Sequence, residues 1–313
     1  MNHTYHFPPH IPVLYHEVIR WMQPKDGGVY VDGTVGAGGH AKGILTASAP
    51  AGKLLGLDLD PNALELASHH LEEFRDRIRL VSASYHTIPE QLIQTGWGQA
   101  DGILLDLGVS SLQLDRPERG FSFQFEGPLD MRFNPQAGLS AKDLINNLEE
   151  NELADLIWRY GQERKSRKIA KAICRSRPIA TTQELSDIIQ KAVGRYEPRL
   201  HPATRTFQAL RIAVNRELDV LAEALPNAVK SLAPGGRLLI ITFHSLEDRL
   251  VKDFFHRESR DCICPPTQPI CTCQHQATLK KLTAKPVCPS EEEIKQNPRS
   301  RSAHLRVAMK KLA

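Results

Sequence analysis

Three short apolar runs of this chain each end in an aspartate, and helix-forming segments separate the runs. The runs are residues 29–32, 53–58 and 102–106, and they close with Asp32, Asp58 and Asp106. Continuous apolar runs of this length between helices are typical of strands buried on both faces of a parallel sheet. We therefore predict an α/β fold with a mainly parallel, doubly wound sheet.

A glycine-rich segment, Gly33 to His40, connects the first of these strands to a helix-forming stretch. Glycines at such a turn let the backbone approach a ligand closely and direct free N–H groups at it. Asp60 and Pro61 supply a cap and a first-turn proline for a helix that we predict to about Arg77. Further strands are predicted at 78–81 and 237–243, a turn at 234–236, helices at 218–232 and 246–257, and a terminal hairpin between 279–283 and 304–309.

The α/β pattern is interrupted from about Asp115, where capped helical segments replace the strands. Ser140 to Asp143 and Thr181 to Glu184 have the spacing of capping boxes. We predict an inserted all-helical domain at residues 115–206. Residues 1–114 and 207–313 would then form one α/β domain.

The composition is that of an ordinary soluble protein, with 313 residues, 41% hydrophobic and 24% charged. No apolar run approaches the roughly 20 residues that span a bilayer, so no membrane segment is expected. Residues 1–12 carry histidines and prolines where a secretory signal would be basic and then apolar. We expect a cytoplasmic protein, and the sequence does not fix its oligomeric state.

Four of the six cysteines form two close pairs, Cys262-x-Cys264 and Cys271-x-Cys273. Clustered cysteines in an intracellular protein indicate a metal before a disulfide. The C-x-C spacing, however, departs from the C-x2-C of zinc knuckles. We expect reduced thiols with no metal, so that chelators leave activity intact, and a zinc site is the alternative.

The glycine loop and the aspartates leave two classes of cofactor open. Gly36-x-Gly38-x-x-Ala41 satisfies a relaxed dinucleotide fingerprint, which is typical of a nicotinamide-dependent oxidoreductase. Three residues nevertheless separate Asp32 from Gly36, whereas in dinucleotide folds the first glycine follows the strand directly. An acid at the end of the strand suits a cationic ligand such as S-adenosyl-L-methionine, and Asp58 is placed to accept the ribose hydroxyls of either cofactor.

Seven segments together resemble the bacterial small-subunit rRNA cytosine-N4 methyltransferase family of the MraW type. They run in the family's order over nearly the whole chain: DGTVGAGGH at 32–40, DGILLDLGVSS at 101–111, RGFSF at 119–123, GPLDMR at 127–132, PATRTFQALR at 202–211, FHSLED at 243–248 and NPRSRSA at 297–303. The resemblance implies a Rossmann-like class I methyltransferase sheet with a helical insertion. It implies cytidine 1402 of 16S rRNA as substrate and 16S rRNA or the small ribosomal subunit as partner.

The resemblance also implies a set of cofactor contacts, to which the residues themselves add Asp32 and Gly36. The contacts fall on Gly38, Gly39, His40, Asp58, Tyr85, Asp106 and Gln113. The loop and the aspartates are predicted independently from their spacing. Tyr85 and Gln113 depend on the resemblance alone.

The catalytic group is not identified by the sequence. Many amino-methyltransferases have Pro-Pro-aromatic after the acid of the fourth strand, whereas here Leu107, Gly108 and Val109 follow Asp106. Candidates on the substrate side are Asp106, Asp130, Arg132, His244 and Ser245. Phe121 and Phe123 could stack on a base, although core packing is the better expectation for both, and His244 could instead be bonded to neighbouring backbone.

A basic stripe is the candidate contact to RNA. Between Arg159 and Arg177 eight Lys or Arg residues accompany a single acid, Glu163. On a helix from about Gln162, the side chains of Arg164, Lys168, Lys171 and Arg175 would share one face, with Ile169 and Ile173 on another. A solvated helix face is the alternative. A noncatalytic RNA-binding protein on the same fold also remains open, although the loop glycines and ligand aspartates disfavour it.

Overall fold

The computed structural model describes residues 12–194, 201–268 and 270–312. The expectation of a cytoplasmic protein depends on residues 1–12, and all of these except Pro12 lie outside the described residues. The chain divides into two compact units, Met1–Gly108 with Leu221–Ala313, and Val109–Val220. The second unit extends beyond the predicted insertion at both ends. One reason is that Gln208, on a helix that continues past residue 206, donates to the carbonyl of Tyr160 at 3.1 Å.

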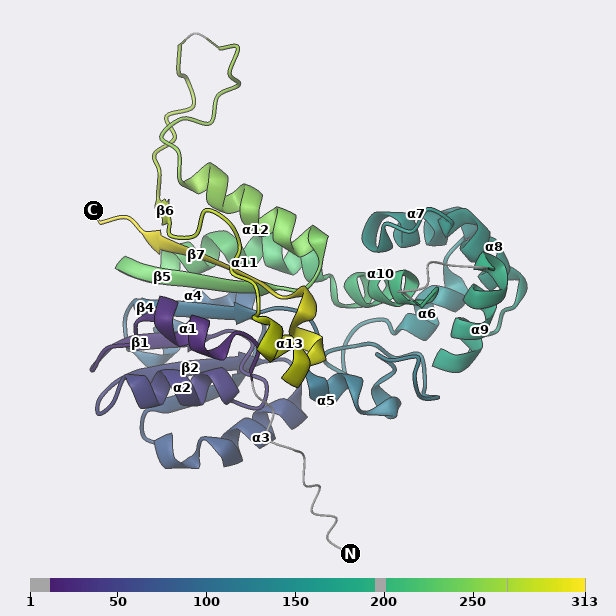
Figure 1. Cartoon of the computed structure of the whole chain (residues 1–313), viewed down its shortest axis with the longest axis horizontal. Helices are drawn as coiled ribbons and strands as arrows, with labels where there is room; N and C mark the ends of the chain where they lie inside the picture. Colours follow the sequence, from purple (N-terminus) through teal and green to yellow (C-terminus); the bar gives the residue numbers. More distant parts are fainter. Residues whose placement is uncertain (1–11, 195–200, 269, 313) are drawn as a thin grey trace, which may run out of the picture. The chain divides into compact units, whose positions relative to one another are not determined.

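The first unit contains a seven-stranded sheet in the order β3-β2-β1-β4-β5-β7-β6 (Figure 1). Its strands are β1 (Val29–Asp32), β2 (Lys53–Asp58), β3 (Ile78–Ser82), β4 (Ala100–Asp106), β5 (Leu232–Thr242), β6 (Leu279–Lys281) and β7 (His304–Lys310). Strands β1 to β5 pair in parallel, and β7 runs antiparallel to both of its neighbours. The prediction of a doubly wound, Rossmann-like sheet is confirmed, as is the terminal hairpin.

Helices cover both faces of this sheet. They are α1 (Tyr15–Met22), α2 (Gly39–Ala47), α3 (Pro61–His70), α4 (Ile88–Thr95), α11 (Glu217–Ser231), α12 (Ser245–Glu258) and α13 (Glu291–Gln296). Short 3-10 helices lie at η1 (Glu72–Phe74), η2 (Tyr85–Thr87) and η4 (Pro298–Ser302). Helices α1, α2 and α3 bury residues such as Val18 and Ile44 against one face. Helices α4, α11 and α12 bury residues such as Ile88 and Val251 against the other.

Two predicted element boundaries in this unit are wrong. Helix α3 ends at His70, because the chain tightens into η1 instead of continuing to Arg77. The expected turn at 234–236 lies inside β5. The register passes from Ala100 opposite Leu232 to Gly102 opposite Arg237, so these residues form a bulge in a strand that starts earlier than predicted.

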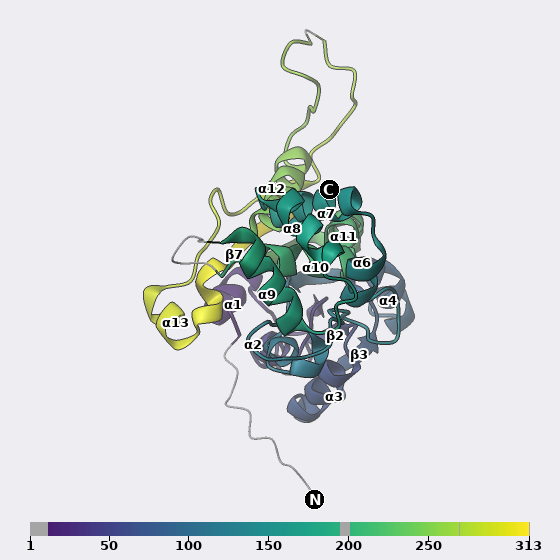
Figure 2. The ribbon, with the colours of Figure 1, turned by 90° about the vertical axis from the view of Figure 1, so that its right-hand side faces the viewer.

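The second unit is built from helices, and Figure 2 gives a second view of them. They are α5 (Ser111–Leu114), α6 (Ala141–Asn147), α7 (Glu150–Gly161), α8 (Ser166–Arg175), α9 (Thr182–Val193) and α10 (Thr204–Asn215), with the 3-10 helix η3 (Pro117–Arg119). Both predicted capping boxes are confirmed at the starts of α6 and α9. The second unit has a hydrophobic core of its own, separate from the two cores of the first unit. This core includes Ile157, Ile169 and Leu210.

Candidate active site

The carboxyl ends of β1, β2 and β4 bring Asp32, Asp58 and Asp106 to one edge of the sheet. Strand β1 pairs with β2 on one side and with β4 on the other. The strand order reverses between β1 and β4, so this edge is the topological switch point where open α/β sheets bind ligands.

The glycine loop is attached to the strands on both sides of β1. Gly33 N–H donates to the carbonyl of Leu104 at 2.9 Å, and Val35 N–H donates to the carbonyl of Leu57 at 2.9 Å. Gly36 and Gly38 have φ values of +52° and +87°, a left-handed backbone that favours glycine. A Cβ on Gly33 would lie 2.9 Å from the Cβ of Tyr85, so Tyr85 is adjacent to the start of the loop.

Asp58 joins the second strand to the glycine loop. Its Oδ2 accepts from Gly36 N–H at 2.9 Å, and its Oδ1 accepts from Asp60 N–H at 2.9 Å. Burial raises the pKa of Asp58, and these two N–H groups oppose that effect. Each oxygen retains a lone pair, so Asp58 can support the loop and still accept hydroxyl groups of a ligand.

Asp32 and Asp106 are linked through Thr34. Asp32 Oδ1 accepts from Thr34 N–H at 3.2 Å, and Thr34 Oγ1 accepts from Asp106 N–H at 2.7 Å. Burial raises the pKa of Asp32 to about 7, and the Asp58 charge adds to that rise. The pKa of Asp106 lies well above its usual range because of burial and the charges of Asp32 and Glu247.

His40 lies beside Asp106 at the start of α2. Its imidazole is buried, with Nε2 3.7 Å from Asp106 Oδ2, and it stacks on Tyr15 with ring centroids 6.3 Å apart. The site therefore combines an imidazole with three carboxylates.

The donor set fits a positively charged ligand. Within the described part of the chain, Asp106 Oδ1 is buried and accepts no hydrogen bond. A buried carboxylate oxygen without a hydrogen bond is unfavourable unless a cation or donor approaches it. A cationic group at this edge would satisfy Asp106 and stabilise the ionised forms of all three acids.

Two residues predicted after β5 lie at the start of α12. His244 is the N-cap of α12, because its Nδ1 accepts from Glu247 N–H at 3.3 Å and its Nε2 lies 3.1 Å from Glu247 Oε1. Ser245 is the first residue of that helix. The contact to Glu247 N–H is the backbone bond expected in the alternative for His244, and a substrate-side role for His244 or Ser245 stays a prediction. Glu247, which the sequence analysis did not single out, also accepts from Phe243 N–H at 3.0 Å.

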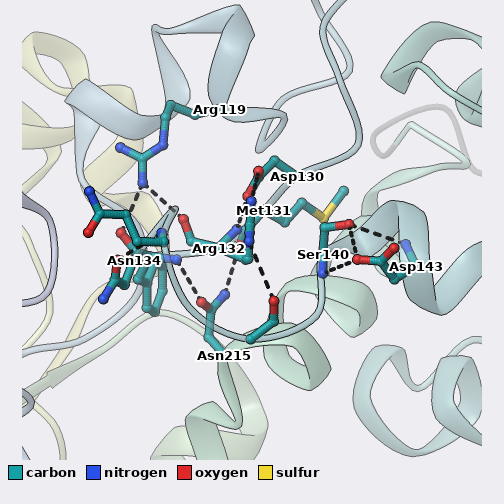
Figure 3. Close-up of polar contacts among 11 residues, drawn as sticks. Arg119, Asp130, Met131, Arg132, Asn134, Ser140, Asp143 and Asn215 are labelled. Carbon is teal, nitrogen blue, oxygen red and sulfur yellow. Dashed lines mark hydrogen bonds and ion pairs between the residues drawn. The ribbon is translucent and has the colours of Figure 1, made fainter.

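Asp130 and Arg132 pair with one another in the second unit (Figure 3). Arg132 Nε and one terminal nitrogen donate to the two carboxylate oxygens of Asp130 at 2.9 and 2.7 Å. Burial alone would raise the pKa of Asp130, but the Arg132 guanidinium lowers it below the usual value. The carboxylate is therefore held ionised in an ion pair.

The loop that carries this pair is fixed by two residues that the sequence analysis missed. Asn215 accepts from Phe133 N–H at 2.7 Å and donates to the carbonyl of Met131 at 2.8 Å. Arg119 donates to the carbonyls of Arg132 and Phe133 at 2.9 and 3.0 Å. Both residues lie in motifs noted above or close to them, but their bonds to distant carbonyls leave no pattern in the sequence.

The remaining predicted contacts are also in the second unit. Gln113 is buried, and its side-chain oxygen accepts from Ser110 N–H at 3.1 Å. Phe121 is buried, as expected for core packing, and stacks on Phe133 with centroids 5.8 Å apart. Phe123 stacks on His201 at 4.5 Å.

The basic stripe is exposed on α8. Lys168, Lys171 and Arg175 lie on the helix, and all are exposed, whereas Ile169 and Ile173 are buried as expected. Helix α8 begins at Ser166 rather than near Gln162, because the chain turns at Glu163, whose carboxylate accepts from Lys165 N–H at 2.8 Å. Exposed Arg164 therefore precedes the helix.

A cavity of about 440 Å³ lies beside the start of this stripe. It is lined by Asp155, Trp158, Arg164, Lys165, Ser166, Arg167 and Lys168. Trp158 is 56% exposed, which is unusual for an indole and places an aromatic surface among cations. The sequence analysis did not single out this tryptophan.

Among the described helices, none is long and apolar enough to cross a membrane.

Comparison with known proteins gives matches along nearly the whole chain. The model of the MraW methylase family matches residues 8–311. The chain is similar to proteins named ribosomal RNA small subunit methyltransferase H. It is 51% identical to one from Dehalococcoides mccartyi over 96% of this chain and 86% of that protein, and 51% identical to one from Heliobacterium mobile over 96% and 98%. A crystal structure of an rRNA methylase from Streptococcus thermophilus matches 96% of this chain and 99% of that one, with 11% identity and a TM-score of 0.45.

Proposed function

The chain belongs to the MraW methylase family, and from this premise we propose that it methylates the N4 amine of cytidine 1402 in 16S rRNA. The methyl donor is S-adenosyl-L-methionine. The reaction would take place in the cytoplasm, on 16S rRNA or on the small ribosomal subunit. The observation that carries the assignment of the cofactor is the set of three acids around the glycine loop.

These acids fit the charge of the cofactor. S-adenosyl-L-methionine carries a positive amino group and a positive sulfonium, and when bound it supplies an electrophilic methyl group. Asp32 and Asp106 would attract the positive groups, and the free lone pairs of Asp58 would accept from the ribose hydroxyls. The loop, with Gly36, Gly38 and Gly39, would let the backbone approach the ligand closely.

We assign Asp106 as the group that accepts a hydrogen from the target amine. The N4 lone pair of cytosine is delocalised into the ring, so an acceptor for one amine hydrogen assists the reaction. Asp106 Oδ1 is buried and has no partner within the described residues, so it is free to accept one hydrogen of the amine. Holding the amine in line with the methyl group would supply much of the remaining acceleration.

The substrate RNA would contact the basic stripe of the second unit. Arg164, Lys168, Lys171 and Arg175 are exposed cations that can follow a line of phosphates. Trp158 beside them offers a flat surface on which an unpaired base can stack. A cytidine inside a stacked helix would have to be everted to react.

The direct test is mass spectrometry of 16S rRNA from a strain that lacks the gene. We expect one N4-methylcytidine to disappear, to return with the wild-type gene and to remain absent with Asp106→Asn. Calorimetric titration with S-adenosylhomocysteine and with NAD separates the enzyme from an oxidoreductase. Binding of NAD alone would favour the oxidoreductase, and an unchanged modification pattern would favour a noncatalytic RNA-binding protein.

A further inference from the structure

The four cysteines of the loop between α12 and β6 converge on one point. The sulfur atoms of Cys262, Cys264, Cys271 and Cys273 all lie within 4.8 Å of one another. The Cys264–Cys271, Cys271–Cys273 and Cys273–Cys262 separations are 4.0, 3.5 and 3.9 Å. All four are free thiols at distances well beyond the roughly 2.05 Å of a disulfide.

These separations are those of sulfur atoms around one tetrahedral metal ion. With a Zn–S bond of about 2.3 Å, the edges of a tetrahedron of sulfurs are about 3.8 Å long. In an iron–sulfur cluster the thiolates are distributed over two or more irons, so at least some of them lie farther apart than ligands of a single ion. The spacing thus indicates a mononuclear site, and four thiolates are a common ligand set of structural zinc.

The loop has polar contacts but no hydrophobic core of its own where the structure describes it. Residues 259–278 form no helix or strand where the structure describes them, and none of those residues is buried. Ile263 and Ile270, the large apolar side chains near the cysteines, are 41% and 74% exposed. Figure 1 shows this loop extending from the end of α12. A bound ion would cross-link this segment and supply the stability that a core gives elsewhere.

The backbone at the loop supports the bound form. Ile263 N–H donates to the sulfur of Cys273 at 3.4 Å, a contact that stabilises a thiolate. His275 is engaged elsewhere, because its Nδ1 lies 2.8 Å from the carbonyl oxygen of Arg260 and its Nε2 lies 3.8 Å from Glu258. The four sulfurs therefore form the ligand set without a histidine.

We propose that Cys262, Cys264, Cys271 and Cys273 bind one structural Zn²⁺ ion that closes the loop between α12 and β6. The geometry outweighs the C-x-C spacing, which had favoured thiols without a metal. The site is structural, because α12 starts at the sheet edge that bears the carboxylates and its 14 residues carry the chain about 20 Å along the helix axis before the loop begins. Removal of the ion should therefore leave cofactor binding unchanged.

The test measures metal content on the full-length protein purified without a histidine tag. We expect about one zinc and no iron per chain by inductively coupled plasma mass spectrometry. The double variant Cys262→Ser/Cys273→Ser should lose the zinc, while Cys288→Ser, which changes an exposed cysteine outside the cluster, should keep it. Binding of S-adenosylhomocysteine checks that each variant is folded.

A second measurement does not depend on any variant. Replacement of the ion by Co²⁺ in the wild-type protein should give the intense visible bands of a tetrahedral cobalt–thiolate centre. Four reactive thiols without bound metal, two disulfides by intact mass, or iron with sulfide would each overturn the proposal. So would retention of zinc by the double variant. None of these results bears on methyl transfer, so the two proposals can fail separately.

Discussion

Asp32 is a buried acid in a site that also contains two other acids. Only 1% of this residue is exposed, and its pKa is raised to about 7 by burial, with the Asp58 charge adding to the effect. An unfolded chain would release that proton near pH 3.9. The folded protein therefore binds more protons than the unfolded chain between about pH 4 and 7, and its stability falls as the pH rises through that range.

Asp32→Asn should remove this loss of stability. The asparagine keeps an oxygen that can accept from Thr34 N–H, while no charge has to be buried. At 1.4 kcal/mol per pH unit, charging Asp32 costs on the order of 4 kcal/mol by pH 8. Urea unfolding of the apo protein at pH 5 and pH 8 measures the free energy of unfolding. We expect the value for the variant, relative to that of the wild type, to be larger at pH 8 than at pH 5. Asp76→Asn, which changes an exposed acid, is the control, and a parallel pH dependence in all three proteins would contradict the expectation.

Asp58→Ala should weaken binding of S-adenosylhomocysteine by about 2 kcal/mol, or about thirtyfold in Kd. The ribose hydroxyls would lose their acceptor, and the N–H groups of Gly36 and Asp60 would lose theirs. The fold should persist, because the hydrophobic cores do not include Asp58. Calorimetry gives the affinity and circular dichroism checks the fold. An unchanged affinity would refute the role assigned to Asp58.

Spacing along the chain was enough to find the acids, but not the roles of every polar residue. Asp32, Asp58 and Asp106 could be predicted because each ends an apolar run, and parallel strands end at one edge. His244 also follows a strand, yet it caps α12 through Glu247. A histidine at that position can serve either role, and only the distance to its partner distinguishes them.

At the scale of elements, local conflicts explain the wrong boundaries. Pro234 and two glycines predict a turn, but β4 pairs with β5 at Leu232 and again from Arg237, which keeps the strand continuous around a bulge. Helix α8 starts late because Glu163 turns the chain. The convergence of the four cysteines could not be predicted either, because C-x-C spacing alone does not show that the two pairs lie close together in the fold.

The exposed face of α8 gives a prediction at this scale. Replacing Lys168 and Lys171 together by Ala should weaken RNA binding and reduce the slope of its salt dependence by up to about two. Affinity for S-adenosylhomocysteine should not change, because neither lysine belongs to the proposed cofactor set. Filter binding at several salt concentrations measures the slope. The matched control is Lys142→Ala/Lys191→Ala, which removes two exposed lysines of the same unit outside the stripe. Equal slopes in both double variants would leave α8 as a solvated surface.

For the whole molecule, the distribution of charge matters more than its total. The chain has 40 Lys and Arg residues and 36 Asp and Glu residues, so the formal net charge is only +4. The acids of the proposed cofactor site are wholly or partly buried in the first unit, whereas the cations of the basic stripe are exposed in the second. Exposed charges are screened by salt, and buried charges are screened much less.

The two binding activities should therefore respond differently to ionic strength. If the four cations of the stripe each neutralise one phosphate of a single strand, raising KCl from 50 to 200 mM should weaken RNA binding about 50-fold. Binding of S-adenosylhomocysteine should change by less than about twofold over the same range, because its acidic partners are shielded from the counterions. Titrations of one protein preparation with each ligand at four salt concentrations measure both slopes. A steep salt dependence for the cofactor would show that its acids are open to solvent and contradict the buried site. A flat dependence for RNA would mean that contacts other than phosphates, such as stacking on Trp158, dominate its affinity.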